Sequence, residues 1–399
     1  MYNSVNITKD ICWVGVNDRQ SRVFENLWPL DHGVAHNSYL IVDDKVALVD
    51  TAAEGQAGDF FRKVESIIGT EKEVDYLIVN HMEPDHSGLM KALLDRNPDM
   101  KIVGNKKTFG LIESFYGITS NLVEVKEGDE IQLGKHTLKF FMTPMVHWPE
   151  TMVTYETHTK ALFSGDAFGS FGSLDGGIFD DEVNLSFFEE EMRRYYSNIV
   201  GKYGAPVQRA INKLSSLDIN YICSTHGPIW RTEPSRVISL YDKWSKQEGE
   251  EGAVIVYGTM YGNTAKMAEL IAQSLSEQGI KNIKLYDSSK THISYILRDI
   301  WKYNGLIIGS CAYNTNLFPP IEALTEKLKH VGLKNKSLGI FGTYSWSGGG
   351  VNNLQKFADE VKISPVAEPV EAKCATCDSD INGLKNLAQK MAESLKSDK

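Results

Sequence analysis

Four residues with metal-binding side chains fall within positions 81–86 of the sequence. They are His81, Glu83, Asp85 and His86, and they follow a short apolar strand predicted at 76–79. Imidazole nitrogens and carboxylate oxygens are common ligands of divalent metal ions in proteins. The spacing therefore predicts a metal site at the end of this strand.

Three further residues of the same chemical types occur later in the chain, each just beyond an apolar strand. His147 lies in TPMVHWPE, Asp166 in FSGDAFG and His226 in ICSTHGP. Loops that follow the strands of a layered sandwich meet at one rim of the fold, where their side chains can converge. We therefore expect these three residues to join the first group in one site.

The elements that must position these residues are short strands with interspersed helices. The segment NSYLIVDDKVALVDTA predicts a hairpin with its turn at Asp43 and Asp44. Further strands are predicted near 76–80, 101–104, 138–143, 153–156 and 161–164, and helices near 59–68, 89–96, 107–115 and 189–197. This mixture predicts an αβ layered sandwich.

The pattern of predicted strands and helices changes near residue 245. The polar, glycine-punctuated stretch 245–252 predicts a linker between domains at 1–248 and 253–399. After it, the strands AVIVYG, NIKLYD, GLIIGS and SLGIFGTY alternate with helices, and a further strand near Val370 and a helix from Ile381 end the chain. Five βα units of this size predict a doubly wound parallel sheet of the flavodoxin-like order.

The loop after the first of these strands has the chemistry of a phosphate site. Thr259, Tyr261, Asn263 and Thr264 offer hydroxyls, an amide and backbone N–H groups at a helix N-terminus. The P-loop lysine and the G-x-G-x-x-G pattern are both missing, which disfavours nucleoside triphosphates and dinucleotides. A phosphate monoester is the expected ligand.

This half of the chain resembles flavodoxin, whose FMN phosphate loop has the form T-x-Y-G-N-T. The resemblance implies that the loops 310–314 and 343–348 flank the flavin ring, with Tyr344 or Trp346 stacking on it. The FMN-binding residues implied in this way are Thr259, Met260, Tyr261, Gly262, Asn263, Thr264, Ser310, Ala312, Tyr313, Asn314, Tyr344, Ser345, Trp346, Ser347 and Gly348.

The order of the N-terminal ligands resembles the metallo-β-lactamase superfamily, whose pattern is H-x-H-x-D-H followed by H, D and H. Glu83 stands where that pattern has a histidine. Hydrolytic zinc sites use mainly neutral imidazoles, whereas a third carboxylate stabilises a higher total metal charge. The set of His81, Glu83, Asp85, His147, Asp166 and His226 therefore favours a redox-active pair of irons over hydrolysis.

Glu83 and the fused flavodoxin half together resemble the flavodiiron proteins, also called A-type flavoproteins, over essentially the whole chain. The resemblance implies a metallo-β-lactamase-like αββα sandwich followed by a flavodoxin-like sheet. It also implies that His81, Glu83 and His147 bind the first iron and that Asp85 and His226 bind the second. Asp166 is the implied bridge, and His86 matches a histidine that lies near the site without usually binding iron.

Three other residues are candidates for the surroundings of the irons. Glu25, in RVFENLW, stands where many members have a histidine, and Tyr195 or Tyr196 is a candidate hydrogen-bond donor. The loop Ser310–Asn314 departs from the S-P-T-x-N form of many members. The C-x-x-C at 374–377 has no second pair, as an iron or zinc site of this type needs, so we interpret it as incidental.

The composition of the chain limits the classes of protein to which it can belong. The chain has 399 residues, 42% of them hydrophobic, a formal net charge of −10 and five cysteines. These values predict a globular protein of two or three domains in a reducing compartment, and they argue against nucleic acid as a main partner. The N-terminus has no secretory pattern and no apolar run spans a bilayer, so we expect a cytoplasmic protein without a membrane partner.

The expected function is that of an NO or O2 reductase in which FMN passes electrons to a diiron site. FMN and the iron pair each store two electrons, which matches the four that dioxygen requires. The family resemblance implies a head-to-tail homodimer, or a dimer of dimers, in which the partner chain supplies the flavin, and an external donor such as a rubredoxin or a deazaflavin.

Two alternatives stay open from the residues alone. One is a zinc hydrolase of the glyoxalase type fused to a flavodoxin electron carrier. The other is an electron carrier whose metal domain only serves docking or dimerisation. The sequence leaves the choice between O2 and NO open, because both substrates need the same open iron pair.

Overall fold

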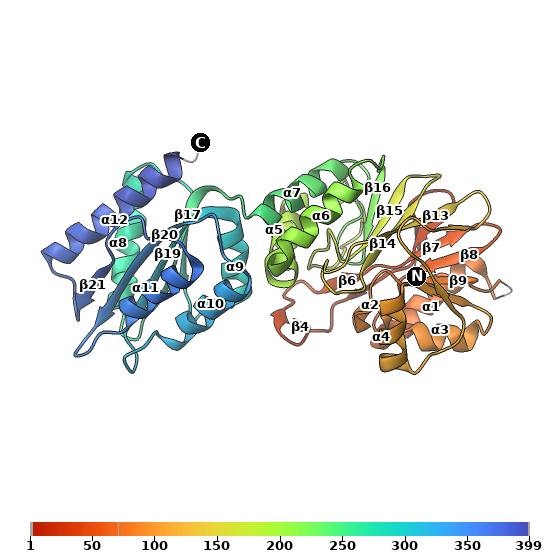
Figure 1. Ribbon diagram of the computed structural model, residues 1–399, viewed down its shortest axis with the longest axis horizontal. Coiled ribbons are helices and arrows are strands. Elements are labelled where there is room, and N and C mark those ends of the chain that lie inside the picture. The colour runs from red at the N-terminus through yellow and green to blue at the C-terminus, as the bar shows by residue number, and fades with distance from the viewer. Residues whose placement is uncertain (1–2, 71, 398–399) are drawn as a thin grey trace. The chain divides into compact units, whose positions relative to one another are not determined.

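The computed structural model of the chain describes residues 3–70 and 72–397. It divides into two compact units, Met1–Ser245 and Lys246–Lys399, each with its own sheets and hydrophobic cores (Figure 1). Among the described residues, none of the helices combines the length and the apolar character that crossing a membrane requires. The two units are described in turn.

The first unit contains a seven-stranded and a five-stranded sheet. The larger sheet has the order β1 (Val5–Asn6), β2 (Ile11–Trp13), β7 (Tyr39–Val42), β8 (Val46–Val49), β9 (Tyr76–Ile78), β10 (Lys101–Gly104), β11 (Leu122–Glu124). The smaller has the order β12 (Glu130–Gln132), β13 (Thr137–Met142), β14 (Met152–Glu156), β15 (Ala161–Gly165), β16 (Tyr221–Ser224). Strands β8 to β11 run parallel, as do β15 and β16.

Successive residues of the central strands enter two different cores because side chains alternate across a sheet. Val49, Ile78 and Val103 face the core shared with Phe140 and Phe163 of the smaller sheet. Their neighbours Leu48, Leu77 and Ile102 pack instead with residues of the outer helices α1, α3 and α4. Burial on both faces explains why these strands are continuously apolar rather than alternating.

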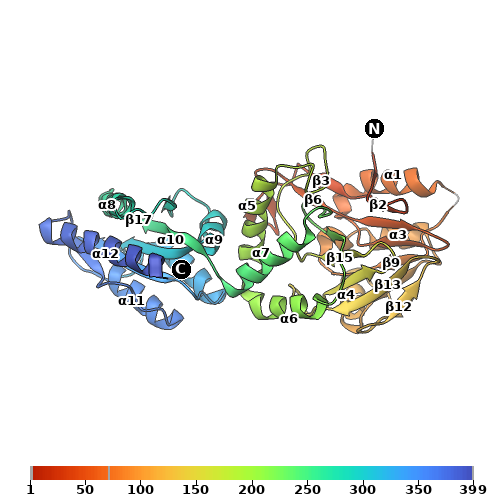
Figure 2. The ribbon, with the colours of Figure 1, turned by 90° about the horizontal axis from the view of Figure 1, so that it is seen from above.

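Helices cover the outer faces of both sheets, which makes the unit an αββα sandwich (Figures 1 and 2). The helices are α1 (Ala57–Ile68), α2 (Pro84–Ser87), α3 (Met90–Arg96), α4 (Lys106–Tyr116), α5 (Leu185–Tyr195), α6 (Gly204–Leu214) and α7 (Pro234–Lys246). Two small antiparallel pairs, β3 (Val16–Asp18) with β6 (Val34–His36) and β4 (Val23–Phe24) with β5 (Trp28–Pro29), complete the unit. The predicted fold class is confirmed.

The second unit is a five-stranded parallel sheet with the order β18 (Ile283–Asp287), β17 (Glu250–Gly258), β19 (Tyr303–Cys311), β20 (Ser337–Tyr344), β21 (Val370–Lys373). Helices α8 (Asn263–Glu277) and α12 (Asp378–Ser397) share a core on one face. Helices α9 (Ile293–Lys302), α10 (Pro319–His330) and α11 (Gly350–Val361) cover the other face (Figure 1). This is the predicted flavodoxin-like order.

Several predicted boundaries differ from the structure. The helix expected at 189–197 begins earlier, at Leu185, where the Asn184 side chain accepts from the N–H of Phe187. It continues into a π-helical turn at Tyr196–Val200. The last helix begins at Asp378 rather than Ile381, and the predicted linker 245–252 shrinks to 247–249 because α7 and β17 extend into it.

Candidate metal centre and flavin pocket

The seven candidate ligands lie at strand ends that share one edge of the sandwich. The loop after β9 carries His81 and leads into α2, where Glu83 is the N-cap residue. In the smaller sheet, β13, β15 and β16 run in the same direction, and His147, Asp166 and His226 follow their carboxyl ends. Convergence thus follows from strand direction and sheet packing.

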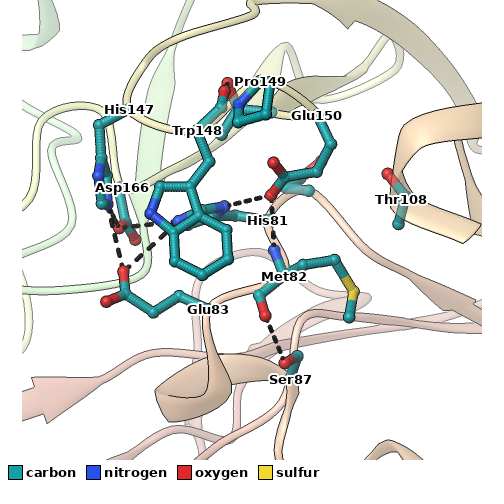
Figure 3. A network of polar contacts seen from close by, with 12 residues as sticks. His81, Met82, Glu83, Ser87, Thr108, His147, Trp148, Pro149, Glu150 and Asp166 are labelled. Carbon is teal, nitrogen blue, oxygen red and sulfur yellow. Dashed lines mark hydrogen bonds and ion pairs between the residues drawn. The ribbon is translucent and has the colours of Figure 1, made fainter. Parts of the chain in front are cut away.

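A first group of four side chains surrounds one point (Figure 3). His147 Nε2 lies 3.1 Å from Asp166 Oδ2 and 3.2 Å from Glu83 Oε2. His81 Nε2 lies 3.5 Å from the same Glu83 oxygen and 3.6 Å from the same Asp166 oxygen. Two imidazole nitrogens thus face two carboxylate oxygens, an arrangement that suits a single cation.

A second group lies on the other side of Asp166. Its Oδ1 atom lies 3.2 Å from His86 Nε2 and 3.6 Å from His226 Nε2. Asp85 approaches both histidines, with Oδ2 3.2 Å from His226 Nε2 and Oδ1 3.7 Å from His86 Nε2. His86, expected near the site but usually not a ligand, therefore points its nitrogen at the same carboxylates as His226.

The donor set fits a pair of metal ions. Several buried ligand atoms have no hydrogen-bond partner among the described residues: His81 Nε2, both ring nitrogens of His86, His226 Nε2 and both oxygens of Asp85. Orphaned buried polar atoms are costly and rare unless a ligand satisfies them. Because Asp166 offers one oxygen to each group, these residues would hold two cations, one in each group.

The electrostatics of the protein part favour ionised carboxylates. Burial raises the pKa of Asp166, but the charges of His86 and His81 outweigh it and hold that pKa well below its usual value. Burial lowers the pKa of His147, but hydrogen bonds to Asp166 and Glu83 raise it to about 10. Without metal, the imidazoles therefore hold protons that a cation must displace.

A surrounding layer of hydrogen bonds orients the ligands, and the sequence did not predict it. His81 Nδ1 lies 2.7 Å from Glu150 Oε1, and His226 Nδ1 lies 2.7 Å from the carbonyl oxygen of Ala35 (Figure 3 shows the first pair). Donation from Nδ1 leaves Nε2 free to face a metal. Thr225 Oγ1 donates to Asp166 Oδ1. The sequence does offer one signal for Glu150, because this acidic residue follows the candidate ligand His147 by three positions in the same loop.

A cavity of about 250 Å³ opens beside the two groups. Its lining includes Glu25, His36, Glu83 and Asp85. Glu25 lies in the turn between β4 and β5 and accepts a hydrogen bond of 2.8 Å from Trp28 Nε1. Desolvation, and then the charge of Glu83, raise the pKa of Glu25 to about 7.

The two tyrosine candidates occupy different places. The Tyr195 ring is fully buried with its centroid 5.6 Å from that of His226, and its hydroxyl has no hydrogen-bond partner among the described residues. Tyr196 packs against Tyr241 and Trp244, with centroids 4.9 and 5.6 Å away. Only Tyr195 therefore contacts a candidate ligand.

The phosphate loop joins β17 to α8 at the point where the strand order of the second unit reverses. The N–H of Gly262 donates to Thr259 Oγ1 over 3.0 Å, and Gly262 has φ +91°, which favours glycine. A small pocket beside the loop is lined by Thr259, Met260, Tyr261, Asn263, Thr264, Cys311, Ala312, Thr343, Tyr344, Ser345 and Cys374. Ligand sites of open α/β sheets lie at such a reversal.

The remaining predicted flavin residues lie outside that lining. Ser310 is buried, and its hydroxyl accepts from the N–H of Phe318 over 2.9 Å. Trp346 is 90% exposed, as is Tyr261 of the lining at 92%, so both rings are available for stacking. Ser347 and Gly348 belong to the same loop as Trp346, and Gly262 lies in the phosphate loop itself. Tyr313 and Asn314 form the turn after β19.

Two lining residues, Cys311 and Thr343, belong to the loops 310–314 and 343–348 that were expected to flank the flavin ring, although neither was named as a binding residue, and Cys374 was not predicted. Cys374 belongs to the C-x-x-C pair that the sequence analysis interprets as incidental, and both cysteines of that pair are exposed. Cys374 lies at the pocket because β21 pairs with β20, and its N–H donates to the carbonyl oxygen of Tyr344 over 2.7 Å. A flavodoxin-like nucleotide pocket and a buried two-metal centre on a β-lactamase sandwich together define the class of a flavin- and metal-containing protein.

Comparison with known proteins places the chain in a family. Residues 34–227 match the model of the ODP family beta lactamase, and residues 255–376 match that of flavodoxin. The nitric oxide reductase of Moorella thermoacetica is 34% identical over 92% of this chain and 93% of its own length. The chain belongs to the family of flavodiiron proteins.

Solved structures agree. The rubredoxin oxygen:oxidoreductase of the anaerobe Desulfovibrio gigas superimposes with a TM-score of 0.94 at 30% identity, covering 99% of both chains. The flavodiiron protein of Giardia intestinalis gives a TM-score of 0.93 at 25% identity, covering 99% of this chain and 97% of that one. The predicted family and fold class are confirmed.

Proposed function

We propose that this protein is an FMN- and diiron-dependent oxidoreductase that reduces O2 to water, NO to N2O, or both. At the level of family, cofactors and enzyme class this expectation is confirmed, since its relatives are named nitric oxide reductase and rubredoxin oxygen:oxidoreductase. The alternative of a zinc hydrolase is not favoured.

The observation that carries the proposal is the placement of Glu83 and Asp166 against His81 and His147, with Asp85 on the far side of Asp166. Three carboxylates in a buried site favour metal ions of high total charge. When bound, the iron pair and FMN supply the redox chemistry and the stored electrons. The chain's own residues bind and orient the ions and the flavin, and they deliver protons to the substrate.

We assign His81, Glu83 and His147 to the first ion and Asp85 and His226 to the second, with Asp166 between them. The contacts of His86 Nε2 support adding it to the second group. Glu25 is proposed to deliver protons at the cavity mouth, and Tyr195 to donate a hydrogen bond beside His226. The domain limits 1–248 and 253–399 stay part of the proposal.

The flavin is proposed to bind with its phosphate at the N-terminus of α8. Backbone N–H groups there point outward with the positive end of the helix dipole, and Thr259 and Thr264 add hydroxyls. The exposed rings of Tyr261 and Trp346 are candidates to cover the isoalloxazine.

We further propose that the protein works in the cytoplasm as a head-to-tail homodimer, or a dimer of such dimers, in which each metal centre receives electrons from the partner's flavin. A rubredoxin-like protein or a deazaflavin would supply the electrons. The name of the Desulfovibrio gigas neighbour, which includes rubredoxin, supports a donor of the first kind.

The decisive experiment is Glu83→Ala in the full chain, compared with the exposed Glu54→Ala as control. We expect anaerobic iron content to fall by about one ion per chain and the consumption of O2 and NO to fall at least 100-fold, because the first group loses a ligand. FMN content, read from flavin absorbance, should stay at the wild-type value.

Unchanged gas consumption in the Glu83→Ala protein would contradict the proposal. So would a wild-type protein that binds zinc and excludes iron when both metals are supplied together. Rates with O2 and NO, measured side by side with one reductant, decide which substrate is preferred.

A further inference from the structure

A histidine outside the predicted ligand set reaches the second metal group. His36 is the last residue of β6, which pairs with β3 through the register of His36 with Val16. Its side chain is buried, and its Nδ1 atom lies 3.4 Å from Asp85 Oδ2. The ring also stands edge-on to that of His226, with centroids 5.4 Å apart and an interplanar angle of 73°.

Ala35, the residue before His36, contacts the same second group of ligands. The carbonyl oxygen of Ala35 accepts a hydrogen bond of 2.7 Å from His226 Nδ1. The end of β6 therefore contacts two members of the second group, one through the backbone and one through a side chain. The first group has a comparable support in Glu150, which faces His81 from a different element.

Asp85 is the carboxylate that most needs such support. Its side chain is 19% exposed, against 1% for Asp166 and 9% for Glu83. Asp166 is fixed by the Thr225 hydroxyl, whereas neither oxygen of Asp85 has a hydrogen bond of good geometry among the described residues. A ligand carboxylate without a fixed orientation loses entropy when it binds an ion, and this weakens the site.

We propose that His36 is a positioning residue for the second metal ion. Its Nδ1 atom, 3.4 Å from Asp85 Oδ2 and itself without a hydrogen-bond partner among the described residues, is the donor that we assign to keeping that carboxylate directed at His226 and His86. With the Ala35 carbonyl, it makes the end of β6 a clamp on two members of the second group, His226 and Asp85. This inference rests on the proposed function, since it presupposes that the centre holds two ions.

The test is a titration of the metal-free full chain with ferrous ion under anaerobic conditions. His36→Phe keeps a flat ring and removes the donor, while His36→Asn keeps an N–H near the position of Nδ1. We expect His36→Phe to bind the first ion normally and the second roughly 10- to 100-fold more weakly. His36→Asn should restore most of that loss.

His136→Phe is the matched control. His136 is also fully buried, and its Nδ1 lies 3.0 Å from a carboxylate oxygen of Glu156, but none of the candidate ligands takes part in that pair. Its second-ion affinity should equal that of the wild type. Mössbauer spectra of the iron-loaded proteins provide a second readout, in which His36→Phe loses intensity from one of two iron components.

An affinity of His36→Phe for the second ion within twofold of wild type would overturn the inference. Equal weakening in His36→Asn would overturn it too, because the donor would then be irrelevant. If His36→Phe does not fold, His36→Asn decides alone: retained second-ion binding supports the clamp and its loss contradicts it. A wild-type chain that binds no iron pair would contradict the proposed function instead.

Discussion

At the scale of single residues, the centre depends on how its carboxylates are held. Asp166 presents one oxygen to each group of histidines, and Glu83 completes the first group. Each anion offsets the positive charge of ions that burial would otherwise disfavour. A glutamate at position 83, in place of a neutral histidine, therefore adds one negative charge and one hard oxygen donor to the first group.

Glu25 gives a prediction about pH. Its pKa of about 7 means that the carboxyl is protonated below that pH and ionised above it. If Glu25 delivers protons, the wild-type rate of gas consumption falls as pH rises through the pKa of Glu25, which a cation bound to Glu83 lowers from the metal-free value of about 7. Glu25→Gln should be roughly 100-fold slower at pH 6 and lose this step in the profile.

The measurement is the rate of O2 or NO consumption between pH 5.5 and 8.5 with one reductant. Glu54→Gln, an exposed acid of the same unit, is the control and should keep the wild-type profile. A Glu25→Gln protein with the wild-type rate and profile would exclude Glu25 as a proton donor.

At the scale of elements, the strand ends are tied to one another beneath the centre. Asp50 follows β8, and its N–H donates to the carbonyl of Ile78 at the end of β9 over 2.9 Å. Its Oδ1 atom accepts from the N–H of Asn80, also over 2.9 Å. These bonds fix the start of the loop that carries His81.

Asp50→Asn is expected to change how stability depends on pH. Burial, partly offset by the charge of His86, raises the folded-state pKa of Asp50 to about 6. Between about 3.8 and 6 the folded state therefore binds more protons than the unfolded one. The contribution of Asp50 to stability is full below this window and is lost as pH rises through it, by roughly 3 kcal/mol.

Denaturant unfolding of the metal-free protein at several pH values checks this. Relative to Asp50→Asn, the wild type should lose stability between pH 4 and pH 7, while the exposed Asp44→Asn should track the wild type. A constant difference between wild type and Asp50→Asn would show that Asp50 keeps an ordinary pKa.

The elements themselves were predictable where their apolar pattern is strong. The hairpin around Asp43 and the parallel strands of the second unit appear where the sequence places them. The short strands β1 to β6 lack such a pattern, because two or three residues carry too little periodicity. His36 lies on one of these strands, β6, so no local pattern indicates that it lies beside Asp85.

At the scale of the whole molecule, the metal centre and the flavin pocket belong to different compact units. The proposed homodimer predicts complementation between two inactive chains. Glu83→Ala removes a proposed metal ligand, and Thr259→Asp places a negative charge where the FMN phosphate is proposed to bind. Random pairing of both chains should restore about a quarter of wild-type activity, because half the dimers then contain one working pair.

Gas consumption of the co-expressed pair, with each variant alone as control, checks this prediction. Each homodimer should be inactive, the first retaining FMN and the second retaining iron. Absence of any restored activity in purified heterodimers would mean that a flavin serves the metal centre of its own chain.

The sequence by itself determined the two fold types, the order of the ligand residues and the phosphate loop, because each is written in local spacing and apolar periodicity. The tertiary structure alone decided which side chains share an oxygen of Asp166, that His86 faces the same carboxylates as His226, that His36 lies beside Asp85, and that Cys374 borders the pocket at the phosphate loop. These contacts join segments far apart in the chain, and their distances depend on how sheets pack rather than on any local pattern.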